Sequence, residues 1–583
     1  MDTFISKQEK YLKNKICECG YNIETVKLNV SSRPEFGDYQ FNGIMQLSKE
    51  YHKSPVQIAN EVVDLIKKDN IYKDINVAGP GFINITFSDE QLIKYVNDLN
   101  KDININYHID NPKTIFLDYG GANVAKALHV GHLRSANIGE ALKRLANSLG
   151  NKTISDAHLG DWGRPIGLVM LEIKKHNPDL PYFDENFVGE YPKESPVTND
   201  DLMDYYPMAS TKAKEDEAYM EEARIITAKF QDGDKGLMAL WNHIMNVSKK
   251  DIKRVYDRLN TSFDLWEGES DSYKYFNELT EYLEKKNIIE DSQGAKIISL
   301  QTKEDDHEIP PLLLVKSNGS ASYETTDLAC IWERMKYYNP DEIWYLTDTR
   351  QALHFEQVFR AAIKSNIVSE NTKLEFVPFG TMNGSDGKPF KTRDGGVMKL
   401  EDLLDLAKVE CEKRLLPNIV GQEREDIAEK VAIAAVKYAD MLSYRLTDYN
   451  FDPVNFSDLQ GKTGPYLLYS TIRMKSLLTK ANDNSITYNE YTSIKDNFDR
   501  NIIIGLLNIN SVIVKSFNLK SLNDITDYLY KITNIYNNFY SQNRILTEEN
   551  SALRESWLLL TRVVYDNNVK LLNILGIEVP EKM

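Results

Sequence analysis

The stretch FLDYGGANVAKALHVGHLRSANIG, residues 116–139, decides the fold, because an apolar strand turns into a helix within it. Residues 115–117 are consecutive apolar residues, as in the buried strands of parallel sheets. His129 and His132 follow where a helix N-terminus presents unpaired N–H groups and the positive end of its dipole. The pattern predicts a phosphate site at which two imidazoles donate hydrogen bonds.

Other interpretations of the two histidines stay open on spacing alone. They also fit a capped helix start, or half of a metal site. The chain has neither a GxxxxGK[ST] loop nor a GxGxxG turn, so a nucleotide bound here needs another anion-binding motif. Gly131 lacks a side chain, which leaves room for a flat ring such as adenine against the backbone.

Several motifs resemble those of one enzyme family. HVGH resembles the HIGH signature of class I aminoacyl-tRNA synthetases, and DYGGANVAKALHVGHLRSANIG is similar to the arginyl-tRNA synthetases in particular. RPEFGDYQ and AGPGFIN, at 33–40 and 78–84, resemble their appended N-terminal domain, which contacts the outer corner of the tRNA. KYADM at 437–441, GKTGPYLLYSTIRMKSLL at 461–478 and the terminal LGIEVPEKM resemble their anticodon-binding bundle.

The composition agrees with a large cytoplasmic enzyme. A chain of 583 residues with 42% hydrophobic residues predicts three or four packed domains. The net charge of −17 does not itself favour nucleic acid, so tRNA binding requires local basic clusters. Four cysteines without a CxxC pair indicate neither a disulfide framework nor a zinc ribbon. The first residues lack an apolar signal core, and asparagines interrupt the longest apolar stretch, 502–514, so we expect neither export nor a membrane span.

The element pattern predicts an α/β fold with a doubly wound parallel sheet. Expected strands alternate with helices, at 114–117, 153–156, 311–315, 342–345 and 374–378. With the resemblance, this implies a Rossmann-like, HIGH-type catalytic domain between a small N-terminal α+β domain and a C-terminal all-helical anticodon-binding bundle. The expected limits are 1–105, 106–400 with a helical insertion at about 177–273, a helical connector at 401–460, and the bundle at 461–583.

Helical periodicity supports the two flanking domains. Near the N-terminus it predicts helices at about 6–19, 56–67 and 89–99, and beyond residue 400 it continues through 427–442, 466–478 and 557–575. The bundle is rich in tyrosine, which at helical spacing is more often core than a base-stacking surface. The resemblance implies that the residues facing tRNA are Arg33, Phe36, Asp38, Tyr466, Tyr469 and Arg473.

A second phosphate motif lies at 380–396, GTMNGSDGKPFKTRDGG. A glycine-rich loop that carries Lys388, Lys391 and Arg393 is suited to closing over a triphosphate. KPFKT resembles the KMSKS loop of class I synthetases, with Pro389 and Phe390 in place of Met and Ser. Lys388 and Lys391 occupy the two lysine positions of that loop.

A binding pocket for arginine requires acceptors, because a guanidinium has five donors and no acceptor. Asp118 ends the first strand, and Tyr323 and Asp327 lie one turn apart on one helix face. By spacing alone these are also a capping carboxylate and a core tyrosine, but the resemblance implies that they hold the guanidinium. It further implies that Asn123 and Gln351 hold the ammonium and carboxylate ends of the substrate.

The remaining family positions include one departure. By resemblance, His354 faces the ATP ribose, and HLGDWG at 158–163 is a family hallmark to which we assign no role. The family usually has proline before the asparagine of the pocket, whereas this chain has Ala122. We expect the pocket to persist with a looser turn at its mouth.

The resemblance implies an arginine–tRNA ligase that uses ATP with Mg²⁺, L-arginine and tRNA(Arg), without zinc, as a cytoplasmic monomer. The implied catalytic residues are His129, His132, Lys388 and Lys391, and the ATP site adds Gly131 and His354. Two other classes stay open: a small-molecule ligase that uses the same adenylation site without tRNA, and a non-catalytic tRNA-binding paralogue. The RNA-facing modules argue against the first, and the intact HVGH and loop lysines argue against the second.

Overall fold

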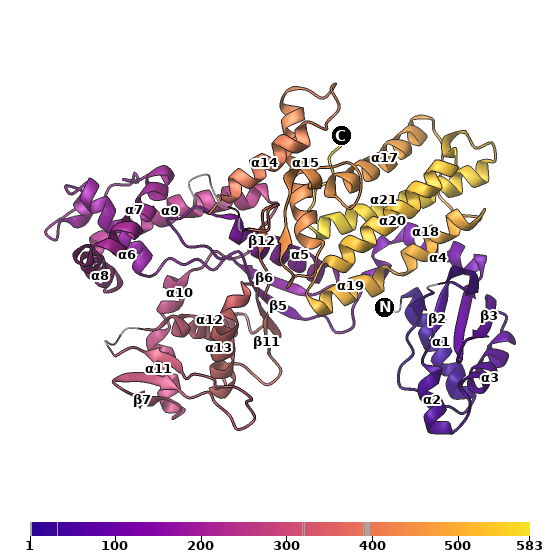
Figure 1. Ribbon diagram of the computed structural model, residues 1–583, viewed down its shortest axis with the longest axis horizontal. Helices are drawn as coiled ribbons and strands as arrows, with labels where there is room; N and C mark the ends of the chain where they lie inside the picture. The colour runs from indigo at the N-terminus through magenta and orange to yellow at the C-terminus, as the bar shows by residue number, and fades with distance from the viewer. Residues whose placement is uncertain (1–2, 32, 318, 320, 389, 391–396) are drawn as a thin grey trace.

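The computed structural model describes residues 3–31, 33–317, 319, 321–388, 390 and 397–583. Figure 1 shows the N-terminal domain in indigo beside the yellow helical bundle, and the catalytic sheet between that bundle and a helical arm on the left. A small lobe lies below the arm and contains β7 (Glu290–Ser292), α11 (Phe276–Lys285), α12 (Tyr323–Tyr337) and α13 (Ala352–Lys364).

The N-terminal domain is an antiparallel sheet covered by helices, which confirms a small α+β domain. Its strand order is β1-β2-β4-β3. The strands are β1 (Asn29–Val30), β2 (Tyr39–Phe41), β3 (Tyr72–Ala78) and β4 (Phe82–Phe87), and the helices are α1 (Phe4–Glu18), α2 (Ile44–Tyr51), α3 (Pro55–Lys67) and α4 (Asp89–Lys101). Ser88 begins α4 with a capping box, because its hydroxyl accepts from the backbone N–H of Gln91.

The catalytic sheet is parallel, with strand order β11-β10-β5-β6. Its strands are β5 (Thr114–Asp118), β6 (Lys152–Asp156), β10 (Glu342–Tyr345) and β11 (Lys373–Phe376), and its main helices are α5 (Leu133–Ser148), α6 (Arg164–His176), α12 (Tyr323–Tyr337) and α13 (Ala352–Lys364). The order reverses between β5 and β10, so their carboxyl ends form the crevice at which such folds bind ligands.

Both faces of this sheet are buried, as the apolar strand predicts. Ile115 and Leu117 belong to the core that contains α5, whereas Phe116 belongs to the opposite core with Leu328 and Ile331 of α12. Successive side chains of a strand point to opposite faces. A continuous apolar run therefore serves two cores, and the predicted doubly wound sheet is confirmed.

One predicted strand belongs to a different sheet. Residues 311–315 do form a strand, β9 (Leu312–Val315), but β9 pairs antiparallel with β8 (Ala295–Ile298), which in turn pairs with β7 (Glu290–Ser292). Gln293 and Gly294 have positive φ angles and form the tight turn between β7 and β8. The helix α11 (Phe276–Lys285) precedes this sheet. The assignment of 311–315 to the parallel sheet was wrong.

The predicted insertion is helical. It consists of α7 (Asn199–Glu215), α8 (Glu217–Gln231), α9 (Lys235–Arg258) and α10 (Glu269–Tyr273). The first three form the arm on the left of Figure 1 with α6. The insertion returns to the catalytic sheet through α10, which packs against α12.

The C-terminal part is helical and rests on the catalytic domain. Its elements are α14 (Leu400–Glu412), α15 (Gly421–Met441), α16 (Pro453–Phe456), α17 (Gly464–Asp483), α18 (Asn497–Leu507), α19 (Ile509–Leu519), α20 (Asn523–Gln542) and α21 (Ser551–Ile574). The last helix contacts α17 and α20 within the bundle, α4 of the N-terminal domain and α5 of the catalytic domain. A two-stranded parallel ladder joins β12 (Met382–Asn383) to β13 (Tyr449–Asn450).

Within the described residues, one segment, 497–519, is long and apolar enough to cross a membrane by length and composition. It consists of two helices, α18 and α19, which meet at Asn508. Half of its apolar window is buried, and both helices pack against α20. This packing is typical of core helices in a bundle.

Candidate active site

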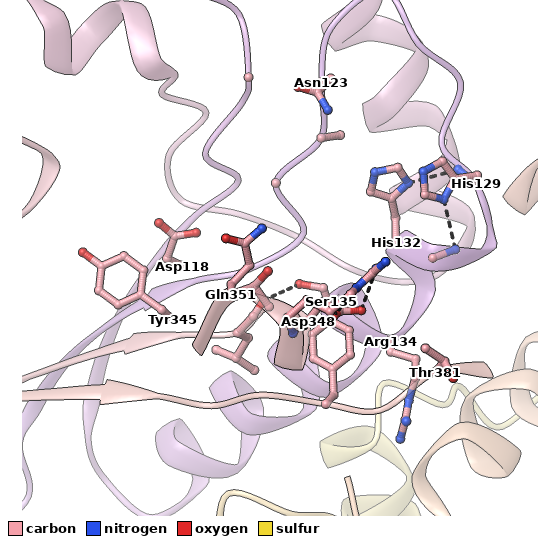
Figure 2. Close-up of a pocket in the computed structure, with 18 of the residues that line it drawn as sticks. Asp118, Asn123, His129, His132, Arg134, Ser135, Tyr345, Asp348, Gln351 and Thr381 are labelled. Atoms are coloured by element: carbon pink, nitrogen blue, oxygen red, sulfur yellow. Dashed lines mark hydrogen bonds and ion pairs between the residues drawn. The ribbon is translucent and has the colours of Figure 1, made fainter. Parts of the chain in front are cut away.

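A cavity of about 710 Å³ lies at the carboxyl ends of β5 and β10. Figure 2 shows Asp118 and Gln351 on one side of it and His129 and His132 on the other. The cavity brings together most of the substrate residues expected from the sequence, namely Asp118, Asn123, His129, Gly131, His132, Tyr323, Asp327 and Gln351. We call its two ends the acidic end and the histidine end.

At the histidine end, His129 and His132 stack in a short 3-10 turn (Val130–His132) that leads into α5. Their ring centroids lie 4.0 Å apart. Nδ1 of His129 accepts from the Gly131 N–H at 3.1 Å, and Nδ1 of His132 accepts from the His129 N–H at 3.0 Å. Because each Nδ1 is an acceptor, the proton of each neutral ring lies on Nε2, where it is available to a phosphate oxygen.

Gly131 is required by the histidine pair itself. A Cβ atom at this position would lie 2.9 Å from Nδ1 and Cε1 of the His129 ring. The missing side chain therefore accommodates the imidazole beside it, in addition to any space it leaves for a ligand.

Burial keeps both imidazoles neutral. Burial lowers the pKa of His129, and the positive charge of Lys126 lowers it further. Burial also lowers the pKa of His132 to about 3. Two uncharged N–H donors therefore face the cavity near neutral pH.

The depressed pKa of His132 predicts a pH dependence of stability. The unfolded chain binds a proton here at about pH 6.5, whereas the folded chain does not until about pH 3. The stability contributed by this neutral ring is therefore present above pH 6.5 and is lost as pH falls toward 3. Between pH 7 and 5 we expect the wild type to lose about 1–2 kcal/mol more unfolding free energy than His132→Asn.

Urea unfolding at the two pH values measures this difference. His52→Asn is the control, because His52 is exposed and its positive φ is well tolerated by asparagine. Equal losses in the wild type and His132→Asn would show that the ring does not resist protonation.

The acidic end gathers carboxylates around the hydroxyl of Tyr323. Burial raises the pKa of Tyr323, and the negative charges of Asp327, Glu269 and Asp118 raise it further. Asp118 ends β5, Tyr323 begins α12, and Asp327 lies one turn further along that helix. The structure thus brings together the residues expected to hold a guanidinium.

Asp118 already carries an internal partner. Nη2 of the buried Arg334 donates to Oδ2 of Asp118 at 2.7 Å and to Oδ2 of Asp156 at 3.3 Å. Burial raises the pKa of Asp118, and the charge of Arg334 opposes this rise. Arg334 therefore holds this carboxylate in place beside the cavity.

The expected contact of His354 with the ATP ribose stays a prediction. His354 is absent from the walls of the cavity. Its Nε2 lies 2.5 Å from Oδ2 of Asp327, and its ring packs against Tyr323 with centroids 4.6 Å apart. The histidine lies on α13 behind α12 and supports the acidic end, because one turn of α13 faces the first turn of α12.

The lysine loop, residues 384–397, borders the cavity through Phe390 and Val397. Lys388 lies in an exposed turn in which its N–H donates to Oδ1 of Asp386 at 3.0 Å and Gly387 has a φ of +75°. Lys388 itself does not line the cavity. Lys391 and Arg393 lie outside the described residues.

Glu269 and His158, to which the sequence analysis assigned no role, are among the other residues that line the cavity. Glu269 begins α10 at the end of the insertion, and burial raises the pKa of its carboxyl to about 7. The acidic run in the insertion did not indicate a functional site, because such a run of charges is usually a solvated face. The motif around His158 was noted, but its spacing did not indicate what it contacts.

Family models match almost the whole chain. Residues 6–87 match "Arginyl tRNA synthetase N terminal domain", residues 95–453 match "tRNA synthetases class I (R), catalytic domain", and residues 467–583 match "DALR anticodon binding domain". The arginine–tRNA ligase of Alkaliphilus oremlandii is 44% identical over 100% of both chains. That of Agathobacter rectalis is 42% identical over 97% of both.

The chain belongs to the arginyl-tRNA synthetase family. As a family member it is a class I aminoacyl-tRNA synthetase, an enzyme. Solved arginyl-tRNA synthetases share its fold: that of Plasmodium falciparum has a TM-score of 0.81 at 24% identity, and that of Thermus thermophilus 0.77 at 19%, each over 100% of both chains.

In this arginyl-tRNA synthetase, the turn that carries Ala122 is tied down by backbone hydrogen bonds. Gly160 N–H donates to the Ala122 carbonyl at 3.0 Å, and Val124 N–H donates to the Gly160 carbonyl at 3.1 Å. A Cβ at Gly121 would lie 2.5 Å from the His158 carbonyl oxygen. The turn is thus supported without proline, and a changed arginine affinity stays a prediction.

Five of the six residues expected to face tRNA fall into two groups. Arg33 and Phe36 are exposed side by side on the N-terminal domain, with the guanidinium 5.9 Å from the ring centre. Tyr466, Tyr469 and Arg473 lie together on α17. Arg473 packs against the rings of Tyr540 and Tyr469, with its guanidinium 4.8 Å and 6.0 Å from their centres.

Asp38, the sixth, is bonded within the protein. Its Oδ2 accepts from Nη2 of Arg500 at 2.6 Å and from the Phe87 N–H at 2.8 Å. Because Arg500 belongs to α18, this ion pair fastens the N-terminal domain to the bundle. A contact of Asp38 with tRNA stays a prediction.

Proposed function

We propose that the chain catalyses the arginine–tRNA ligase reaction in this cavity, with arginine at the acidic end and ATP at the histidine end. The observation that carries the proposal is the arrangement of two neutral imidazole donors at one end of a cavity and the carboxyl groups of Asp118, Glu269 and Asp327 at its other end, at the switch point of the sheet. The first set suits phosphate oxygens and the second suits a cation.

At the acidic end, Asp118, Glu269, Asp327 and the Tyr323 hydroxyl would receive the five guanidinium donors. Asn123 and Gln351 would hold the ammonium and carboxylate groups, which directs the carboxylate toward the histidine end. His354 would orient Asp327. A site that matches the planar, charged guanidinium rejects lysine, because lysine would leave some of the buried acceptors unpaired. No editing step is therefore needed.

The reaction would proceed in two steps. A carboxylate oxygen of arginine attacks the α-phosphorus of ATP in line, and pyrophosphate leaves. A hydroxyl of the terminal tRNA ribose then attacks the carbonyl carbon, and AMP leaves. His129, His132, Lys388 and Lys391 would stabilise the phosphate charge, and no side chain would form a covalent intermediate.

Mg²⁺ would accompany ATP. In the described part of the chain, no group of three His, Cys, Asp or Glu side chains gathers as a metal site. This fits an ion that is held mainly by substrate phosphates, where it would neutralise charge on the triphosphate. The monomeric state and the cytoplasmic location stay predictions.

We predict that arginine activation requires tRNA. RNA contacts to the tyrosines of α17 would favour the active state of the site, so this state is scarce without RNA. Pyrophosphate exchange with purified protein, arginine and ATP should rise strongly when tRNA(Arg) with an oxidised terminal ribose is added. The activation by tRNA should become weaker as the salt concentration rises. The logarithm of the tRNA binding constant should fall with the logarithm of the salt concentration, with a slope of about −0.7 to −0.9 per phosphate contact.

The same assay separates the alternatives. Fast exchange before tRNA is added would favour the tRNA-independent ligase. No exchange under any condition, together with intact tRNA binding, would favour the non-catalytic paralogue. Exchange with lysine in place of arginine would overturn the assignment of the acidic end.

A further inference from the structure

The side chain of Arg134 connects three parts of the molecule just below the histidine end. It is the second residue of α5 and is 2% exposed. Its Nε donates to Oδ1 of Asp440 on α15 at 2.9 Å, and its Nη1 donates to the Thr447 carbonyl at 3.1 Å. Its guanidinium lies 5.2 Å from the centre of the Tyr449 ring. Figure 2 shows Arg134 beside Thr381, with its guanidinium directed away from the two histidines.

The segment that Arg134 holds, residues 447–451, forms the base of the lysine loop. Oδ1 of Asp448 accepts from the Thr381 N–H at 2.6 Å, and the Tyr449 N–H donates to the Thr381 carbonyl at 3.1 Å. The Phe451 N–H donates to the Asn383 carbonyl at 2.8 Å. These bonds are part of the β12–β13 ladder, and residue 384, the first of the lysine loop, follows β12 directly.

The other end of the lysine loop is attached to the histidine motif itself. The Val130 N–H donates to the Met398 carbonyl at 3.1 Å, and the Leu400 N–H donates to the Leu128 carbonyl at 2.9 Å. One end of the loop is therefore bonded to HVGH directly, whereas the β12 end is bonded to residues 447–451, which Arg134 connects to α5.

The ion pair is well suited to this task because it is buried and directional. Asp440 is fully buried, and its second oxygen accepts from Nδ2 of Asn137 at 3.2 Å, so α5 contacts it twice. A guanidinium donates to Asp440 and to the Thr447 carbonyl from one rigid plane, which a lysine ammonium does not reproduce.

We propose that Arg134 is a positioning residue, which through Asp440 and Thr447 holds β12 and the turn of Lys388 that follows it in a fixed position relative to His129 and His132, for the transfer at the α-phosphate. This rests on the proposed function of the cavity and the lysine loop. The substrate arginine binds at the opposite end, so Arg134 acts on the chemical step and leaves arginine binding unchanged.

The test is Arg134→Lys, measured by pyrophosphate exchange with tRNA present and oxidised at its terminal ribose. We expect kcat to fall about 10–100-fold, because a small displacement of a charged group is costly, while KM for arginine stays within about twofold. Asp440→Asn should give a similar loss, and the double variant should lose little more than either single one.

Arg144→Lys is the matched control. Arg144 lies on the same helix, bonds Glu140 at 2.7 Å and the Asn573 carbonyl at 3.1 Å, and has no contact with residues 447–451. Thermal unfolding of all variants monitors the loss of stability that any change in α5 causes. Equal falls in kcat for Arg134→Lys and Arg144→Lys, or a rise in KM for arginine that matches the fall in kcat, would overturn the proposal.

The outcomes also separate this proposal from the proposed function. If Lys388→Ala slows exchange and Arg134→Lys does not, the positioning role is wrong and the function stands. If the wild type shows no exchange with arginine, the function itself is wrong.

Discussion

Replacing Asp327 by asparagine is expected to lower kcat/KM for arginine by about 10²–10³-fold. The carboxylate lies at the acidic end, where His354 holds one of its oxygens at 2.5 Å. Asparagine keeps the shape of the side chain but removes the charge, and it presents an amide where a guanidinium requires an acceptor. Steady-state aminoacylation at varied arginine concentration measures the loss.

KM for ATP should hardly change in Asp327→Asn, because ATP is assigned to the opposite end of the cavity. Glu324→Gln serves as the control, since Glu324 lies on the same turn of α12 and is not part of the cavity wall. Equal losses for arginine and ATP, or an equal loss in Glu324→Gln, would assign Asp327 a structural role only.

Removing Lys388 or Lys391 from the lysine loop should have a comparable effect on the transfer at the α-phosphate of ATP. We expect Lys388→Ala and Lys391→Ala each to slow adenylate formation by about 10²–10³-fold with the affinity for arginine nearly unchanged. A charge that acts on the leaving pyrophosphate stabilises the transition state more than the bound substrate. The rate at which arginyl-adenylate forms in a single turnover, with tRNA present, measures this step.

Lys303→Ala is a suitable control, because Lys303 is also exposed on a loop and does not line the cavity. If only one of the two loop variants loses activity, that lysine alone contacts the leaving group. Wild-type rates in both would remove the lysine loop from the mechanism, and Arg134 would then have no loop to position.

Local patterns predicted in advance where the cavity lies in the fold. The apolar run 115–117 requires a strand buried on both faces, and the following HVGH begins a helix, so the two histidines had to lie at the carboxyl end of the sheet. The same logic placed Tyr323 and Asp327 on one face of α12, because they are one helical turn apart. Such features depend on a few neighbouring residues and are therefore legible in the sequence.

Family motifs extended this reasoning to the ends of the chain. The N-terminal, catalytic and anticodon-binding regions inferred from short motifs correspond to the three matched family models. Such motifs do not indicate which distant residue a single side chain contacts. Asp38 has the same motif context as Arg33, yet its carboxylate is occupied by Arg500, which is more than 400 residues away along the chain.

Only the tertiary structure decided which distant groups meet. A strand pattern does not specify its partner, so 311–315 was assigned to the parallel sheet although β9 pairs antiparallel with β8. His354 supports Asp327 because α12 and α13 pack side by side, and Glu269 reaches the cavity because the insertion returns through α10. The bond of Arg134 to Asp440 spans 306 positions, and no local periodicity encodes such a contact. The sequence by itself determined the chemistry of the site, whereas packing between elements decided the neighbours that orient it.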